Sequence, residues 1–211
     1  MDEEIEVVFR SVVKGDGDEL SLMVSRLTSL FGPGVEVDIF EESLVFKPLQ
    51  DSGNMNVVNR DVIVTFEYRS SAASNTVVAK HIGSSIPVIT ETDADAFSAY
   101  NVRTSSASNA NLRRTFLKSG FVVRNDFARK GLKFATRKDR VTILLSRPYN
   151  ALFTEGVSYL EGSACWETLP GPLPFESDYL LEVKQCIKSQ ADVSSAVMFM
   201  TKLIAEFKKV T

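Results

Sequence analysis

The sequence predicts an α+β protein in which antiparallel strands dominate. Short segments of alternating apolar and polar residues recur along the 211-residue chain, which is the period of strands with one buried face. Two longer segments, one near each end, instead space their apolar residues as amphipathic helices do. An antiparallel β architecture of this length commonly forms one domain, so we expect a single domain over residues 1–211.

Composition indicates an ordinary globular protein. The chain has 44% hydrophobic and 24% charged residues and a formal net charge of −3, which argues against disorder and against a main role in gripping nucleic acid. The acidic start lacks the positive charge of a secretory signal, and no apolar run approaches the roughly 20 residues that span a bilayer. We therefore expect an intracellular protein without membrane contact, in which Cys165 and Cys186 are reduced packing residues.

The first half of the chain predicts one helix among several strands. Strands are expected at residues 5–13, 61–69 and 76–82, and residues 35–40 and 44–47 are expected as two strands joined by a polar turn. Asp18 is the expected N-cap of a helix that Gly32 ends. The apolar face of that helix carries Leu20, Met23, Leu27, Leu30 and Phe31. Residues 84–108 are rich in Ser, Thr and Ala without clear periodicity, so we expect a long mobile loop or connector there.

The second half predicts a helix–strand–strand–strand segment and a closing helix. A helix beginning at residue 109 or 111 should end at Gly120, followed by strands at 121–126, 132–136 and 141–146. Residues 150–176 are expected to be a second mobile loop, with 159–168 as its one candidate strand, and 179–184 as the last strand. Ser189 should cap a final amphipathic helix.

No catalytic motif, metal-ligand pattern or phosphate-binding glycine loop is evident. His81 is the only histidine, so a histidine-dependent triad would need it, and its strand setting favours a structural or surface role. The strongest charge feature is a basic cluster, which either solvates a helix and a hairpin or meets an acidic protein or nucleic acid. It comprises Arg113, Arg114, Lys118, Arg129, Lys130, Lys133, Arg137, Lys138 and Arg140.

One pattern does suggest an enzyme. Acidic and basic residues alternate in Glu4-x-Glu6, Glu67-x-Arg69 and Glu182-x-Lys184, as in the barrel walls of triphosphate-tunnel enzymes, where carboxylates hold a divalent metal and cations hold phosphates. That family carries a lysine two residues beyond its second glutamate, and here the position is Val8. A metal-dependent triphosphatase is therefore the alternative function.

From Lys80 onward the sequence resembles the Mediator subunit 18 family of the transcription Mediator head module. The matching segments are residues 80–83 (KHIG), 116–121 (FLKSGF), 126–134 (DFARKGLKF), 141–145 (VTILL) and 179–183 (YLLEV), in order and at matching spacing. The resemblance covers roughly half the chain. It implies a closed or nearly closed antiparallel β-barrel with flanking helices, distantly related to the triphosphate-tunnel barrels.

The resemblance also implies a function. Such a protein would be a nuclear, non-catalytic scaffold without cofactor or metal that helps relay regulatory signals to RNA polymerase II. It would pair with Mediator subunit 20 and bind the C-terminal helix of Mediator subunit 8, with no direct contact to nucleic acid. The signature residues are Gly120, Phe121, Phe127, Lys130, Gly131, Phe134, Tyr179 and Glu182. Arg137, Lys138 and Arg140 form a candidate protein-contact hairpin.

Overall fold

Eight strands form a closed antiparallel β-barrel. The structure is a computed structural model that describes residues 3–15, 18–46, 61–69, 76–88, 97–107, 111–136, 140–149, 151–153, 166–168 and 178–208. The strands lie around the barrel in the order β1-β10-β7-β6-β2-β3-β4-β5. Their bounds are β1 Glu3–Val13, β2 Val35–Phe46, β3 Asp61–Arg69, β4 Thr76–Ile86, β5 Phe97–Ala107, β6 Phe121–Ala135, β7 Val141–Tyr149 and β10 Tyr179–Ile187. The short strands β8 (Ala151–Phe153) and β9 (Trp166–Thr168) pair with each other. The predicted fold class is confirmed; the extent of the domain stays a prediction.

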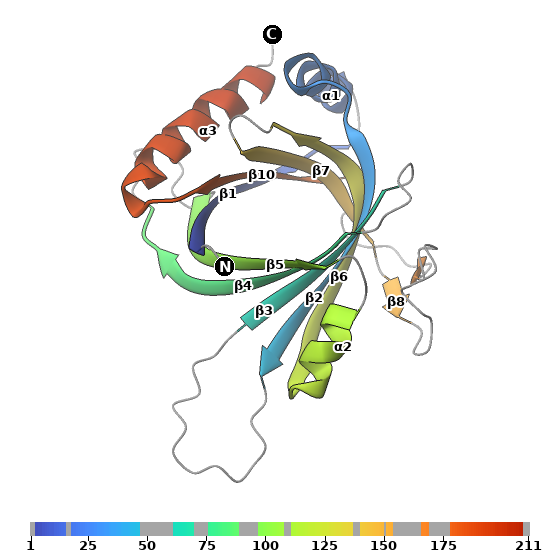
Figure 1. Ribbon diagram of the computed structural model, residues 1–211. Coiled ribbons are helices and arrows are strands. Elements are labelled where there is room, and N and C mark those ends of the chain that lie inside the picture. Colours follow the sequence, from blue (N-terminus) through green and yellow to red (C-terminus); the bar gives the residue numbers. More distant parts are fainter. Residues whose placement is uncertain are drawn as a thin grey trace.

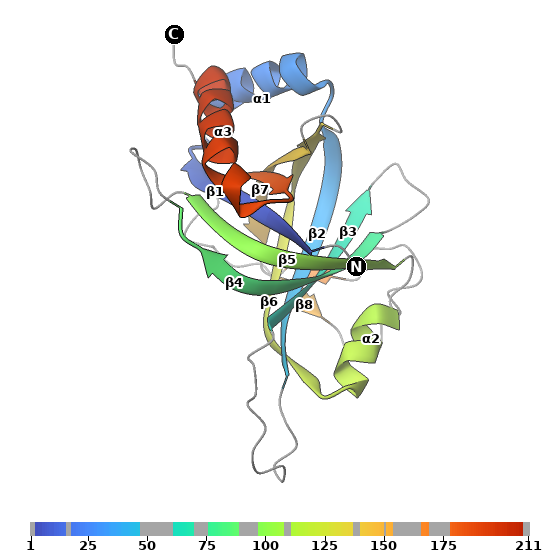
Figure 2. The same ribbon diagram turned by 60° about the vertical axis from the view of Figure 1, so that its left-hand side comes forward.

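The described ranges contain three α-helices, which lie outside the barrel (Figure 1). The helices α1 (Asp18–Phe31) and α3 (Val193–Lys208) lie near each other over the wall formed by β1, β10 and β7. The helix α2 (Asn111–Lys118) lies at the other end, beside β2 and β6, as the rotated view also shows (Figure 2). No helix in the described ranges is long and apolar enough to cross a membrane.

The main hydrophobic core lies between that wall and the two helices, outside the barrel. Met23 and Leu27 of α1 and Met200 and Phe207 of α3 are almost fully buried against outward-facing strand residues. The strands contribute Ile5, Val7, Phe9, Val141, Ile143, Leu145, Leu181 and Val183. Leu30, expected on the buried face of α1, is half exposed, so that face is narrower than predicted. Ser189 caps the short 3-10 turn Gln190–Asp192 directly before α3, accepting a hydrogen bond from the Ala191 amide.

Two predicted breaks in strands are wrong. Residues 41–43, expected as a turn, continue β2 through Phe46, where Glu42 is buried and Glu41 contacts the buried Arg129. Residues 127–131, expected between two strands, continue β6 from Phe121 to Ala135. In both cases the strand pairs with neighbours on either side, and ladder hydrogen bonding outweighs the local polarity that suggested a turn.

The mobile loop predicted at residues 84–108 is also wrong where the structure describes it. Residues 84–86 end β4, and residues 97–107 form β5, which pairs with β4 on one side and β1 on the other. Residues 89–96 lie outside the described ranges. Within the second predicted loop, 150–176, only β8 and β9 are described, and Trp166–Thr168 falls inside the candidate strand at 159–168.

Candidate functional site in the barrel interior

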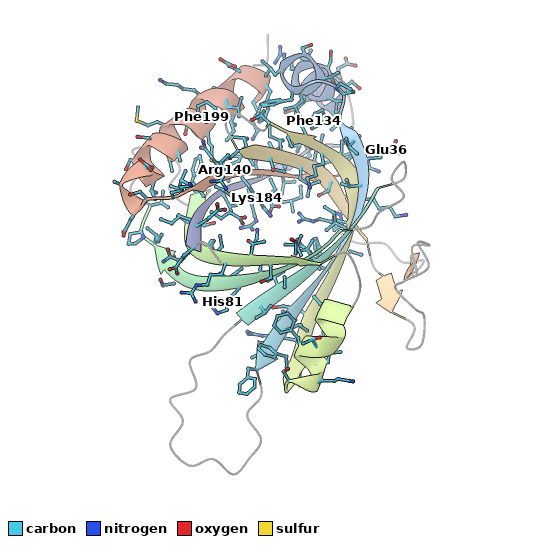
Figure 3. All side chains as sticks on the ribbon, in the orientation of Figure 1. Glu36, His81, Phe134, Arg140, Lys184 and Phe199 are labelled. Carbon is cyan, nitrogen blue, oxygen red and sulfur yellow. The ribbon has the colours of Figure 1, made fainter. Side chains whose placement is uncertain are left out.

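Charged residues of β1 and β10 lie on the faces that point into the barrel. Along β1, Ile5, Val7 and Phe9 pack outward against the helices, so the alternating residues Glu4, Glu6, Val8 and Arg10 face inward. The same alternation on β10 turns Glu182 and Lys184 inward, because Leu181 and Val183 belong to the outer core. Figure 3 shows Lys184 inside the ring of strands. Both faces of these strands are therefore covered, one by helices and one by the opposite wall.

Glu182 is the centre of the interior charges. Its carboxylate accepts from Arg10 Nε at 2.9 Å and forms ion pairs with Arg129 Nη1 at 3.3 Å and Lys184 Nζ at 2.7 Å. The residue is only 3% exposed. Burial by itself would raise the pKa of this carboxyl, but the charges of Lys184, Arg129 and Arg10 outweigh burial and lower the pKa to about 2. Glu182 is thus an anion fixed among three cations.

Arg129 links Glu182 to the opposite wall. Its Nη1 faces Glu182, and its Nη2 donates to Glu41 Oε1 on β2 at 2.9 Å. Glu41 Oε1 also accepts from the Thr65 hydroxyl of β3 at 3.4 Å. Arg129 is 3% exposed, and its Nε is buried without a hydrogen-bond partner. The chain of contacts therefore runs across the interior from β1 and β10 through β6 to β2 and β3.

A second group lies nearer the N-terminal end of β1. Glu6 pairs with Lys80 of β4, and Glu4 pairs with Arg140 at the start of β7. The hydrogen bond from Arg140 to Glu4 raises the pKa of that guanidinium. Cys186 is a half-buried free thiol whose pKa is raised by burial and by the neighbouring Glu6 carboxylate. A thiol with a raised pKa is a poor nucleophile, which fits a packing role.

Each interior carboxylate of the described strands is paired with a cation. Glu4, Glu6, Glu41 and Glu182 each contact at least one Arg or Lys in the described part of the chain. Within the described ranges, no three His, Cys, Asp or Glu side chains lie close enough together to hold a metal ion. Val8, which stands where tunnel enzymes carry lysine, is also buried. The arrangement can hold the walls together and would need to break ion pairs to bind a phosphate or a metal.

Sequence analysis identified part of this interior and missed part. Glu4, Glu6, Glu182 and Lys184, taken from the triphosphate-tunnel pattern, are brought together, while the side chains of Glu67 and Arg69 lie outside the described set. Arg10, Glu41, Lys80 and Arg129 were not singled out as interior residues. The prediction that Arg129 belongs to a basic cluster on a helix and hairpin is wrong, because its guanidinium lies inside the barrel. The missing signal was strand continuity, since Glu41 and Arg129 both fall in the predicted breaks.

Several signature residues have packing roles. A Cβ on Gly131 would lie 2.1 Å from the Leu145 carbonyl oxygen, so β6 and β7 approach each other closely only because this position lacks a side chain. Gly120 has a φ of 90°, which glycine adopts without strain. The ring of Phe134 is buried, and the Phe121 ring packs edge-on against Phe116 at 5.1 Å. Their standing as a family signature stays a prediction.

At least partial exposure is common to three further predicted residues, Phe127, His81 and Arg140. Phe127 is exposed, with the Arg129 guanidinium 5.9 Å from its ring centroid. His81 is half-buried on the outside of β4 (Figure 3). Two residues of the predicted contact hairpin, Arg137 and Lys138, lie outside the described ranges. The third, Arg140, forms an ion pair with Glu4. Its backbone has a positive φ of 51°.

A pocket of about 430 Å³ opens on the outer wall beside α1. Leu20 and Val24 of α1 form one side, and the Tyr179 ring lies 4.3 Å from the Arg147 guanidinium on the other. Lys130 lies at the same pocket, which gives that signature residue an exterior position. Several of its strand residues, Leu132, Leu145 and Tyr179, belong to or pack against the outer core, which places the pocket on the outside of the wall.

The fold is similar to solved structures, whereas no family model and no curated protein matches the sequence at a significant level. A chain of the Schizosaccharomyces pombe Mediator head module matches with a TM-score of 0.63 at 13% identity, covering 96% of both chains. The PH1819 protein of Pyrococcus horikoshii OT3 matches with a TM-score of 0.56 at 15% identity, covering 97% of this chain and 89% of that one. At such identities the likeness shows the fold alone.

A putative adenylyl cyclase from Hippeastrum, HpAC1, described as having a dominant triphosphatase activity, is a more distant neighbour. It matches with a TM-score of 0.40 at 10% identity, covering 96% of this chain and 87% of that one. This similarity is too low to support a conclusion about the present chain.

Proposed function

We propose that this chain is a non-catalytic structural subunit of the Mediator head module. In that role it binds other Mediator subunits and helps relay regulatory signals to RNA polymerase II. The observation that carries the proposal is the fold likeness to a chain of the S. pombe Mediator head module over 96% of both chains. The ordered motif matches at residues 80–83, 116–121, 126–134, 141–145 and 179–183 support the same family.

The finer expectations follow from the family resemblance. The partners we propose are Mediator subunit 20, as the other half of a heterodimer, and the C-terminal helix of Mediator subunit 8. A role in this assembly implies a nuclear location. The buried, mutually paired charges support the non-catalytic part of the proposal, because Glu182 is already surrounded by Arg10, Arg129 and Lys184.

Affinity purification from the source cell with identification by mass spectrometry tests this proposal. Tagged full-length chain should recover several Mediator subunits in stoichiometric amounts, and an unrelated β-barrel protein with the same tag serves as the control. Recovery of the chain without any Mediator subunit would refute the assignment.

A metal-dependent triphosphatase is the second candidate, favoured by the gathering of Glu4, Glu6, Glu182 and Lys184 in one barrel interior. It predicts magnesium- or manganese-dependent phosphate release from triphosphate substrates. That release should fall sharply in Glu4→Gln and Glu6→Gln, because carboxylates hold the metal in this chemistry. Under our main proposal, purified protein shows no such turnover. Turnover that depends on Glu4 and Glu6 would reverse the choice.

A further inference from the structure

The end of β6 beside α2 extends past the strand that pairs with its other edge. β6 pairs with β2 from Phe121 to Lys133, but its pairing with β7 begins only at Ala128. Among the described residues, none forms a ladder with the second edge of residues 121–127, and no backbone hydrogen bond outside regular structure reaches them. In a strand, alternate residues point their backbone amide and carbonyl groups to opposite edges. Within the described residues, the groups of 121–127 that point away from β2 are therefore available to pair with an added strand.

Three apolar side chains along this edge are exposed. Val122, Val123 and Phe127 are 44%, 40% and 39% exposed, and Phe46 on the paired end of β2 is 37% exposed. An exposed apolar strand edge is unusual in a protein that works alone, because such edges invite pairing with other chains. The pattern is that of a surface covered in an assembly.

The charge around the edge specifies the occupant further. Residues 111–127 contain four basic residues and one acidic residue, Asp126, for a net charge of +3 in a chain whose total is −3. Lys118 and Arg124 are exposed. A register shift opposite Ser43 and Leu44 leaves Arg124 without a residue across from it, which makes it the bulged residue of β6. A bulge increases the local twist of the strand and re-aims the side chain of the bulged residue.

We propose that residues 121–127 of β6 bind an extended segment of a partner subunit in which apolar and acidic residues alternate, and that this segment adds a strand to the sheet. The inference deepens the proposed function, on which it rests for the identity of the assembly. Backbone pairing supplies the attachment. Val122 and Phe127, together with the basic charge, select the sequence that attaches.

Photo-crosslinking and amide hydrogen exchange on the purified full-length assembly test the proposal. With a benzophenone amino acid at position 122, we expect crosslinks to one extended partner segment that alternates apolar and acidic residues. Amides within 121–127 should exchange at least tenfold more slowly in the assembly than in the free chain.

Two double variants test the side chains. V122E/F127E should recover at least tenfold less of that partner. V122K/F127K removes the same apolar area but keeps attraction for acidic residues, so its recovery of the partner should fall less. Unchanged thermal unfolding of both variants confirms that the exposed substitutions leave the barrel folded.

The outcomes separate this inference from the proposed function. If Mediator subunits co-purify but position 122 gives no crosslink and residues 121–127 stay unprotected, the inference is overturned and the proposed function stands. If no Mediator subunit co-purifies, the proposed function fails. The strand-addition inference is then decided by crosslinking from position 122 within the complex that is recovered. Absence of a crosslink to a partner segment would overturn it. Crosslinks to a second copy, or protection already present in the free chain, would also overturn it, because another strand would then occupy the edge.

Discussion

Arg10 and Glu182 stand opposite each other on neighbouring strands and join their side chains inside the barrel, with Arg10 Nε 2.9 Å from Glu182 Oε2. They are 172 residues apart in the chain. Lys184 and Arg129 complete the ring of cations around the same carboxylate. Ion pairs as well as apolar packing therefore stabilise the barrel, and the free energy of unfolding depends on Glu182 staying ionised.

Replacing Glu182 by Gln should destabilise the protein strongly. The change leaves Arg10, Arg129 and Lys184 buried or half-buried without their shared anion, and breaking a buried ion pair in this way costs about 3–5 kcal/mol. Urea unfolding followed by circular dichroism measures the loss. Glu3→Gln is the matched control: Glu3 and Arg103 are both more than half exposed, so it should cost less than about 1 kcal/mol. Equal effects of the two substitutions would contradict the arrangement.

Stability should fall in acid between about pH 4.5 and pH 2. The pKa of Glu182 is lowered from 4.5 to about 2 in the folded protein, so the unfolded chain binds a proton at this site more readily as the pH drops. The contribution is fully present above pH 4.5 and is lost as the pH falls through 2. A shift of this size corresponds to about 3 kcal/mol of unfolding free energy. Glu182→Gln should show a flatter dependence over the same pH range; an unchanged slope would remove Glu182 as its source.

Gly131→Ala should separate β6 from β7. The new Cβ would lie 2.1 Å from the Leu145 carbonyl oxygen and 2.6 Å from Ser146 Cα, and both are backbone atoms that cannot rotate away. Overpacking of this kind costs about 1–3 kcal/mol or more. Gly32→Ala is the comparison, because nothing lies within 4 Å of its Cβ and only its positive φ of 82° carries a cost, about 1 kcal/mol. The midpoint of thermal unfolding should be lower for Gly131→Ala than for Gly32→Ala. The reverse order would contradict the close approach of β6 and β7 at Gly131.

Truncation of Met200 should weaken the packing of α3 on the barrel. Met200 is fully buried in the main core, so Met200→Ala should cost about 2–5 kcal/mol in chemical unfolding. Met198 lies on the same helix but is 61% exposed, and Met198→Ala should change stability by less than about 0.5 kcal/mol. If both substitutions cost the same, the assignment of the buried face of α3 is wrong.

The sequence predicted the elements that follow a simple period and missed those that do not. α1, α3 and the strands around Ile5 and Leu181 follow 3.6- or 2-residue spacing, because each has one face against the outer core. β5 carries mostly Ser, Thr, Ala and Asn, a mixture that does not favour a strand strongly. It is a strand because its backbone pairs with β4 on one side and with β1 on the other. Both partners lie outside the segment itself, and β1 is about 90 residues away in the chain, so local patterns do not reveal the pairing.

The interior site was predictable only in part for a related reason. Glu4 and Glu6 were noticed because they alternate with apolar residues on one strand. Glu41 and Arg129 sit in runs of polar residues that look like turns, and their burial follows from barrel closure alone. A charged residue in such a run lies in the interior only because its strand pairs with neighbours on both sides and the barrel closes around it.

The pairing of β1 with β10 also sets when the barrel can form. β1 needs both β5 and β10 as neighbours, so its second edge remains open until residues 179–187 have left the ribosome. At about 5–20 residues per second, that interval is on the order of ten seconds. Contacts between residues far apart in the chain are slow to form, because a long loop must close before they can stabilise the fold. Until β10 pairs with it, this edge of β1 can pair with other chains, so the nascent protein is exposed to aggregation over that interval.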